Sequence, residues 1–153
     1  MSKKVFIISL IVLLLVAIIG YSAYFVIKNK EKSTPTKTLN EIATCIQNKD
    51  YSAMYKLITE SSQDNISEDQ FIDRHKNIYD GISMKDYKID VISETEQEDG
   101  SYIVDYNVFM DTVSVGEIKF ATTSKFIKNK ETKKYEIEWS SKFIFPDLED
   151  TDK

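Results

Sequence analysis

The chain has little of several residue types on which common functional sites depend. Among its 153 residues there are one cysteine, one histidine, one tryptophan, two prolines and four glycines. The single cysteine, Cys45, permits no internal disulfide. The single histidine, His75, is the only ordinary general base near neutral pH, so acid–base catalysis has one candidate centre.

A basic excess is also missing from most of the chain. Residues 1–32 carry five lysines and one glutamate, a net charge of +4, which leaves −9 for residues 33–153. Nucleic acids and anionic lipid surfaces are bound by clustered lysine and arginine. The charge therefore argues against both partners for the acidic part, and we expect no nucleic-acid binding.

One long run has no charge at all. The 23 residues Val5–Ile27 are uncharged and flanked by lysines, and as a helix they would reach roughly 35 Å, enough to cross a bilayer core of about 30 Å. A cleaved signal peptide is disfavoured because its apolar region is usually about 7 to 15 residues long. A lipid anchor would need a cysteine just after the run, which the chain lacks. We predict a single transmembrane helix over 5–27.

The charges beside this run leave its orientation open. Lys3 and Lys4 precede it, whereas three lysines and one glutamate follow it closely, and long domains are exported largely regardless of such charges. The predicted organisation is an N-terminal segment over 1–4, the span, a short polar linker over 28–35, one folded domain over 36–146 and an acidic C-terminal tail over 147–153.

The first part of the domain has the pattern of three helices. Apolar residues recur at helical spacing from Thr36 to Asn48, and Asp50 can cap a second, short helix. A third begins at Ser67, where Gln70 completes a capping box, and Gly81 suits the C′ position that ends it. The residues expected to face inward are Leu39, Ile42, Ala43, Ile46, Tyr51, Met54, Tyr55, Ile58, Phe71, Ile72, His75, Ile78 and Tyr79.

From Met84 the apolar period changes to two, which is typical of strands. Strands are predicted over 87–94, from Tyr102 to Met110, from Ile118 to Phe126, and from Tyr135 to Trp139, where Trp139 should be largely buried. The turns are Glu98–Gly100 and the charged segment Lys128–Lys133. Helices followed by an antiparallel meander predict an α+β domain with helices on one face of a bent sheet.

Several motifs carry a resemblance to a known family. They are Asn48-Lys49-Asp50-Tyr51 with Tyr55, Ile78-Tyr79 before a glycine, and Tyr135-x-Ile-x-Trp139 followed by Ile144-Phe145-Pro146. Together with the order of elements, they resemble the N-terminal, nuclear transport factor 2-like domain of class B penicillin-binding proteins of the methicillin-resistance type. The resemblance covers essentially the whole chain and implies a cone of three helices on a curved sheet, preceded by a membrane helix.

The chain also departs from that family. The transpeptidase domain that follows in those proteins needs Ser-x-x-Lys, Ser-x-Asn and Lys-Thr-Gly motifs, and none of them occurs here; the only Lys-Thr pair, Lys37-Thr38, is followed by leucine. We therefore expect no transpeptidase chemistry from this chain. It is expected to be either the truncated front of such a protein or a free-standing relative of its front domain.

The remaining site candidates have structural interpretations. His75 with Asp73 or Asp86 is the best acid–base pair on offer, but a lone histidine on an apolar stripe is more often a core residue. Cys45, set among apolar residues, is expected to be a small buried hydrophobe. Carboxylates are concentrated in two segments, but neither has the spacing of a calcium loop. We therefore predict no metal and no cofactor. The carboxylates are Glu94, Glu96, Glu98 and Asp99 in the first segment, and Asp147, Glu149, Asp150 and Asp152 in the second.

We therefore predict that the chain is a non-catalytic, membrane-anchored module of cell-wall synthesis. The resemblance implies a role in peptidoglycan synthesis and in the response to β-lactams. The resemblance implies a cytoplasmic N-terminus over 1–4 and an extracellular C-terminal domain, so the expected location is the plasma membrane of a bacterium, with one pass. The expected partner is a transpeptidase domain or another wall-synthesis protein, contacted through Trp139, Phe143, Ile144, Phe145 and Pro146. Two alternatives stay open: a membrane-tethered cone that binds or transforms a small molecule, and an exported sensor or adhesion domain.

Overall fold

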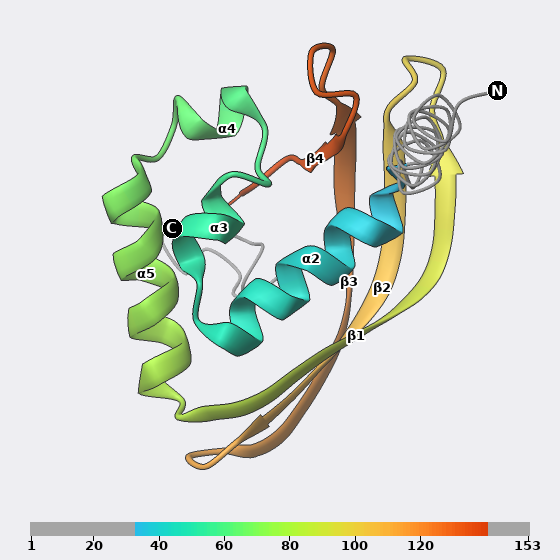
Figure 1. Ribbon diagram of the computed structural model, residues 1–153. Helices are drawn as coiled ribbons and strands as arrows, with labels where there is room; N and C mark the ends of the chain where they lie inside the picture. Colours follow the sequence, from blue (N-terminus) through green and yellow to red (C-terminus); the bar gives the residue numbers. More distant parts are fainter. Residues whose placement is uncertain (1–32, 141–153) are drawn as a thin grey trace, which may run out of the picture. The chain divides into compact units, whose positions relative to one another are not determined.

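The computed structural model describes residues 33–140, in which helices come first and four antiparallel strands follow (Figure 1). This arrangement confirms the predicted α+β class. The helices are α2 (Pro35–Asn48), α3 (Tyr51–Tyr55), α4 (Glu60–Gln63) and α5 (Glu68–Gly81). The strands are β1 (Met84–Glu96), β2 (Tyr102–Thr112), β3 (Gly116–Lys128) and β4 (Tyr135–Ile137).

The longer helices begin where their capping residues stand. The Thr34 side chain accepts a hydrogen bond from the backbone of Lys37, and Pro35 occupies the first turn of α2, where its missing N–H costs nothing. In α5, the Ser67 hydroxyl accepts from the Gln70 backbone, and the Gln70 side chain accepts from the Ser67 backbone. The predicted capping box is thus confirmed.

The end of α5 differs from the prediction. Gly81 was expected just beyond the helix in a left-handed conformation, but it is the last helical residue, and Ile82 continues with φ −86 while its N–H bonds to Ile78. The left-handed residue is Ser83, with φ 51. The turn therefore falls two residues later than the glycine indicated.

One helix was not predicted. Residues 33–140 contain four helices rather than three, because α4 forms one short turn after Thr59, whose side chain accepts from Ser62. Only Ser62 of this helix is buried, so no apolar period marked it in the sequence.

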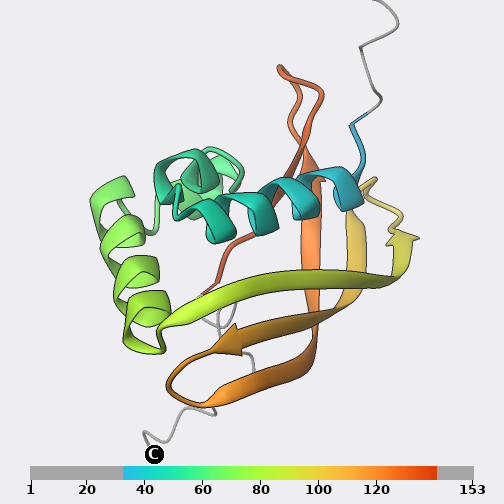
Figure 2. The same cartoon turned by 60° about the horizontal axis from the view of Figure 1, so that its bottom comes forward.

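The strands form one sheet in the order β1-β2-β3-β4, with every neighbouring pair antiparallel. Figure 2 shows how strongly the sheet bends; β1 has register shifts at Met84/Asp86 and Val91/Ser93, and such bulges increase local twist. In β2 the predicted alternation is confirmed: Val104, Tyr106, Val108 and Met110 are all buried. Strand β1 extends beyond the predicted 87–94 at both ends.

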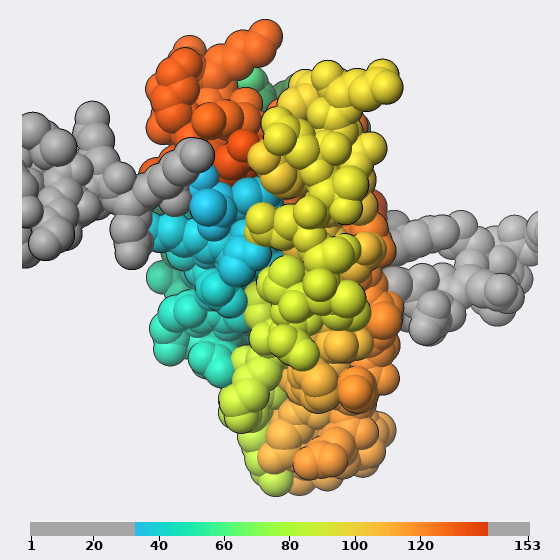
Figure 3. All heavy atoms as spheres, turned by 90° about the vertical axis from the view of Figure 1, so that its right-hand side faces the viewer, coloured from blue at the N-terminus to red at the C-terminus, as the bar shows by residue number. Residues whose placement is uncertain are grey.

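The first turn of α2 connects both edges of the sheet. The Thr36 backbone N–H donates to Glu94 of β1 over 2.8 Å, and the Thr38 hydroxyl donates to the Tyr135 carbonyl of β4 over 2.8 Å. The Tyr135 N–H in turn donates to the Ser33 hydroxyl. In Figure 3 this end of α2, in blue, lies beside the strands that carry these partners. These bonds hold the start of α2 against both edge strands of the bent sheet.

The last strand is shorter than predicted. Ile137 is held between β3 and the segment after α3: its N–H donates to the Leu57 carbonyl, and its carbonyl accepts from the Thr59 N–H. Two residues later the backbone N–H of Trp139 donates to the Ser62 hydroxyl instead of bonding to a neighbouring strand. The strand therefore ends at Ile137, and Trp139 is only partly buried, which corrects the expectation of a largely buried residue.

Several predicted segments lie outside the described residues. These are the N-terminus over 1–4, the span over 5–27, most of the linker over 28–35, and the end of the chain with Phe143, Ile144, Phe145, Pro146 and the acidic tail. Within 33–140, no helix is long and apolar enough to cross a membrane.

Candidate functional site

His75 occupies the centre of the buried face of α5. Its side chain is 0% exposed, and its Nδ1 lies 2.7 Å from the carbonyl oxygen of Phe71, one helical turn earlier. A carbonyl can only accept, so Nδ1 is the nitrogen that carries the proton. The sequence predicted this inward orientation from the apolar stripe of the helix.

Aromatic rings surround the imidazole. The ring centroids of Phe71, Tyr51, Tyr79 and Trp139 lie 4.0, 6.1, 6.3 and 6.3 Å from that of His75. We call these five residues the aromatic cluster. It combines side chains from α3, from α5 and from the segment after β4, and the Arg74 guanidinium covers the outer part with its carbon 5.6 Å from the Trp139 ring centroid.

Burial sets the charge state of the histidine. Desolvation is the largest cause that lowers the pKa of His75, from 6.5 to about 4; the bond to the Phe71 carbonyl opposes this shift, and the Arg74 charge adds to it. His75 is therefore neutral at pH 7. A base with so low a pKa holds few protons at neutral pH, which makes it a poor acid–base catalyst there.

The acid–base pairs considered from the sequence are not formed. Asp73 is exposed on α5, and the hydrogen bonds of Asp86 are made to Gln47, to the Tyr87 backbone and to Lys88. Among residues 33–140, neither carboxylate is within hydrogen-bond distance of His75, whose one bond is to Phe71.

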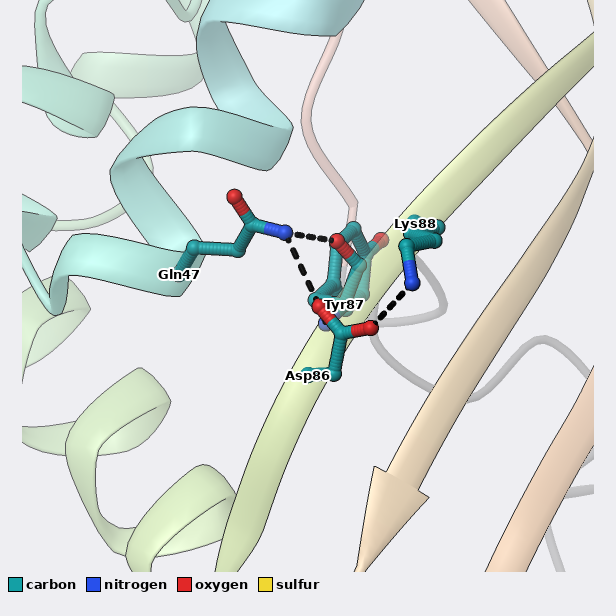
Figure 4. A network of polar contacts seen from close by, with 4 residues as sticks. All are labelled: Gln47, Asp86, Tyr87 and Lys88. Carbon is teal, nitrogen blue, oxygen red and sulfur yellow. Dashed lines mark hydrogen bonds and ion pairs between the residues drawn. The ribbon is translucent and has the colours of Figure 1, made fainter.

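Asp86 belongs instead to a structural network (Figure 4). The Gln47 side-chain nitrogen donates to Asp86 over 3.1 Å and to the Tyr87 carbonyl over 2.7 Å, which ties the end of α2 to β1. The ion pair with Lys88 is the largest cause that lowers the pKa of Asp86. The network satisfies a carbonyl on the outer edge of the sheet, a place where unpaired backbone groups invite unwanted strand pairing.

Cys45 is partly buried, and burial, followed by the charges of Asp50 and Glu41, raises its pKa. Since the thiolate is the nucleophile, a raised pKa lowers its reactivity. This environment agrees with the interpretation of Cys45 as a small hydrophobe.

The carboxylates at the β1–β2 end have partners of their own. Glu94 accepts from the backbone and hydroxyl of Thr36, and Asp99 accepts from the backbone and hydroxyl of Ser101 and lies 3.5 Å from Lys125. Within the described range, no three side chains of the metal-binding types come together. The second acidic segment lies outside it.

A cleft that no sequence pattern indicated lies between α4 and the β3–β4 hairpin. It has a volume of about 660 Å³, and its lining carries both signs of charge, from Lys128 and Lys130 and from Glu60, Glu131 and Glu136. Burial, together with the nearby Glu60, raises the pKa of Glu136 against the opposing bond from Asn129. The cleft depends on α4, and α4 has no periodic pattern, so no sequence signal could have located it.

The fold and this interior define an α+β cone whose single histidine is a packed, neutral core residue. The family model of the NTF2-like N-terminal transpeptidase domain matches residues 34–152, and the chain belongs to that family. The resemblance found in the sequence is thereby confirmed.

One relative and one solved structure place the family match in context. Penicillin-binding protein 3 of Bacillus subtilis (strain 168) is 25% identical over 146 residues, which cover 92% of this chain and 21% of the relative. The chain thus spans about a fifth of the length of that protein. The solution structure of RPA3114, a SEC-C motif containing protein from Rhodopseudomonas palustris, superposes with a TM-score of 0.57 at 10% identity, covering 74% of this chain and 82% of that one. This likeness concerns the fold alone.

Proposed function

We propose that the chain is a membrane-anchored, non-catalytic module of the penicillin-binding protein type, acting as a spacer or docking domain in peptidoglycan synthesis and in the response to β-lactams. The observation that carries the proposal is the family match over 34–152, supported by the alignment with a penicillin-binding protein over 146 residues. A spacer needs a stable fold and an anchor rather than a catalytic site. The uncharged run Val5–Ile27 would supply the anchor.

The interior of the cone supports a structural role. Its one imidazole is enclosed by rings and bonded to its own helix, and its one thiol has a raised pKa. The contact surface that we propose begins at Trp139, a partly buried residue beside Arg74, and continues through Phe143, Ile144, Phe145 and Pro146.

The first test concerns chemistry. The purified chain should form no covalent adduct with fluorescent penicillin, because its 153 residues lack a Ser-x-x-Lys nucleophile. Labelling is read by gel fluorescence, with a penicillin-binding protein that has its transpeptidase domain as the positive control in the same gel. A stoichiometric labelled band for this chain would contradict the non-catalytic assignment.

The second test concerns topology. Trypsin added to intact protoplasts should digest the folded domain, with cleavage in the turn Lys128–Lys133, whose lysines are exposed. Immunoblotting detects the fragments, and a cytoplasmic protein that survives until lysis is the control. A K130Q/K133Q variant should slow cleavage in this turn without changing topology. Protection of the domain until lysis would place it in the cytoplasm and exclude the cell-wall role.

A further inference from the structure

Three polar atoms of the aromatic cluster are buried and have no hydrogen-bond partner among residues 33–140. They are Tyr51 Oη, His75 Nε2 and Trp139 Nε1. Tyr51 and His75 are 4% and 0% exposed, and the His75 ring neighbours both others, at centroid distances of 6.1 and 6.3 Å. Most buried polar groups in folded proteins have a partner, so three exceptions around one imidazole need a common explanation.

The chemistry of the three atoms is complementary. Since Nδ1 carries the proton and donates to the Phe71 carbonyl, Nε2 of the neutral ring is an acceptor. The Trp139 indole N–H can only donate, and the Tyr51 hydroxyl can donate. The set therefore offers two donors and one acceptor, from α3, from α5 and from the segment after β4.

A single water molecule matches this set. It can accept hydrogen bonds from Tyr51 and Trp139 and donate one to His75, which gives the three bonds that buried waters typically make. A domain of this size usually holds several such waters, about one per 27 residues. An apolar ligand would leave all three groups unpaired.

We propose that the aromatic cluster holds one buried water molecule, bound by Tyr51 Oη, His75 Nε2 and Trp139 Nε1. This bridging water connects helices α3 and α5 to Trp139, which lies just after the end of β4. It therefore stabilises the position of Trp139 against the helical layer. This inference does not depend on the proposed cell-wall role.

The substitution Tyr51→Phe tests the proposal, because the sign of its effect differs between a dry and a wet cluster. In a wet cluster it removes a hydrogen bond, and the melting temperature of the full chain should fall by about 4 °C. In a dry cluster it removes an unsatisfied buried hydroxyl, and the melting temperature should stay or rise. An unchanged or raised melting temperature would overturn the proposal.

A matched control is available on the same helix. The Tyr55 hydroxyl donates to the Ile66 carbonyl over 2.9 Å, so Tyr55→Phe shows what the loss of a hydroxyl with a known partner costs. We expect the melting temperatures of the two variants to fall by similar amounts.

Spectroscopy separates the bridge from other causes of instability. The chain has one tryptophan and one histidine, so the indole N–H and the Nε2 nitrogen each give one NMR signal. Tyr51→Phe should shift both signals, whereas Tyr55→Phe should leave both near their original positions. A loss of melting temperature in Tyr51→Phe without movement of either signal would also overturn the proposal.

Discussion

Replacing Phe71 by alanine should lower the free energy of unfolding by about 3 to 5 kcal/mol. Phe71 is 0% exposed, and its ring lies 4.0, 5.4 and 5.8 Å from the ring centroids of His75, Tyr55 and Trp139. The substitution leaves a cavity at the point where α5 meets α3 and the end of the sheet. Domains of this size have a total stability of about 5 to 15 kcal/mol, so the variant should be marginally folded.

Urea unfolding, followed by the fluorescence of Trp139, measures this loss, because the only tryptophan reports on the cone itself. Phe109→Ala is the matched control: Phe109 is partly exposed on β2, where Lys119 lies 4.9 Å from its ring centroid. Its removal should cost less than about 1 kcal/mol. Equal losses in the two variants would show that the face of α5 assigned to the core is wrong.

The helices of the cone were predictable because their signals are local. A cap such as Asp50 accepts from a residue three positions on, and a capping box joins Ser67 to Gln70. Such contacts, together with apolar residues at helical spacing, lie within one short stretch of sequence. The same holds for β2, where strict alternation from Val104 to Met110 fixes the inward face.

The features that were missed depend on contacts between distant parts of the chain. Strand β4 ends at Ile137 because its neighbours Leu57 and Thr59 hold it there and Ser62 accepts from Trp139. Those partners lie about 80 residues earlier in the sequence, in or next to α4, a short helix in which no apolar residues recur at helical spacing. Nothing near Trp139 in the sequence indicates where the strand stops or how deeply the indole is buried.

The candidate site was predictable only in its central residue. The stripe on α5 placed His75 inside, as observed. Its unpaired Nε2, and the proximity of Tyr51 and Trp139 to it, follow from the packing of three elements that are far apart in sequence. Sequence alone left open whether Asp73 or Asp86 would meet the imidazole, and the fold keeps both outside hydrogen-bond distance of it.

The stability of the cone should decrease as the pH falls from about 6.5 towards 4. Burial lowers the pKa of His75 to about 4 in the folded chain, from an ordinary value of 6.5, so between these values the unfolded chain binds more protons than the folded one. The contribution of neutral His75 to the free energy of unfolding is therefore complete above pH 6.5, its pKa in the unfolded chain. This contribution is lost as the pH falls to about 4, its pKa in the folded chain. At about 1.36 kcal/mol per pKa unit, the loss amounts to about 3 kcal/mol.

Urea unfolding at a series of pH values measures this loss, with His75→Phe as the control that keeps a ring but cannot titrate. The carboxylates with lowered pKa, Asp86, Asp99 and Asp105, contribute mainly below their ordinary pKa of 3.8. Glu136, with a raised pKa, acts in the opposite direction, since its contribution is lost as the pH rises. The difference between the two chains therefore isolates His75. Parallel pH curves for the original chain and the variant would show that His75 titrates at its ordinary pKa in the folded chain, and would contradict this prediction.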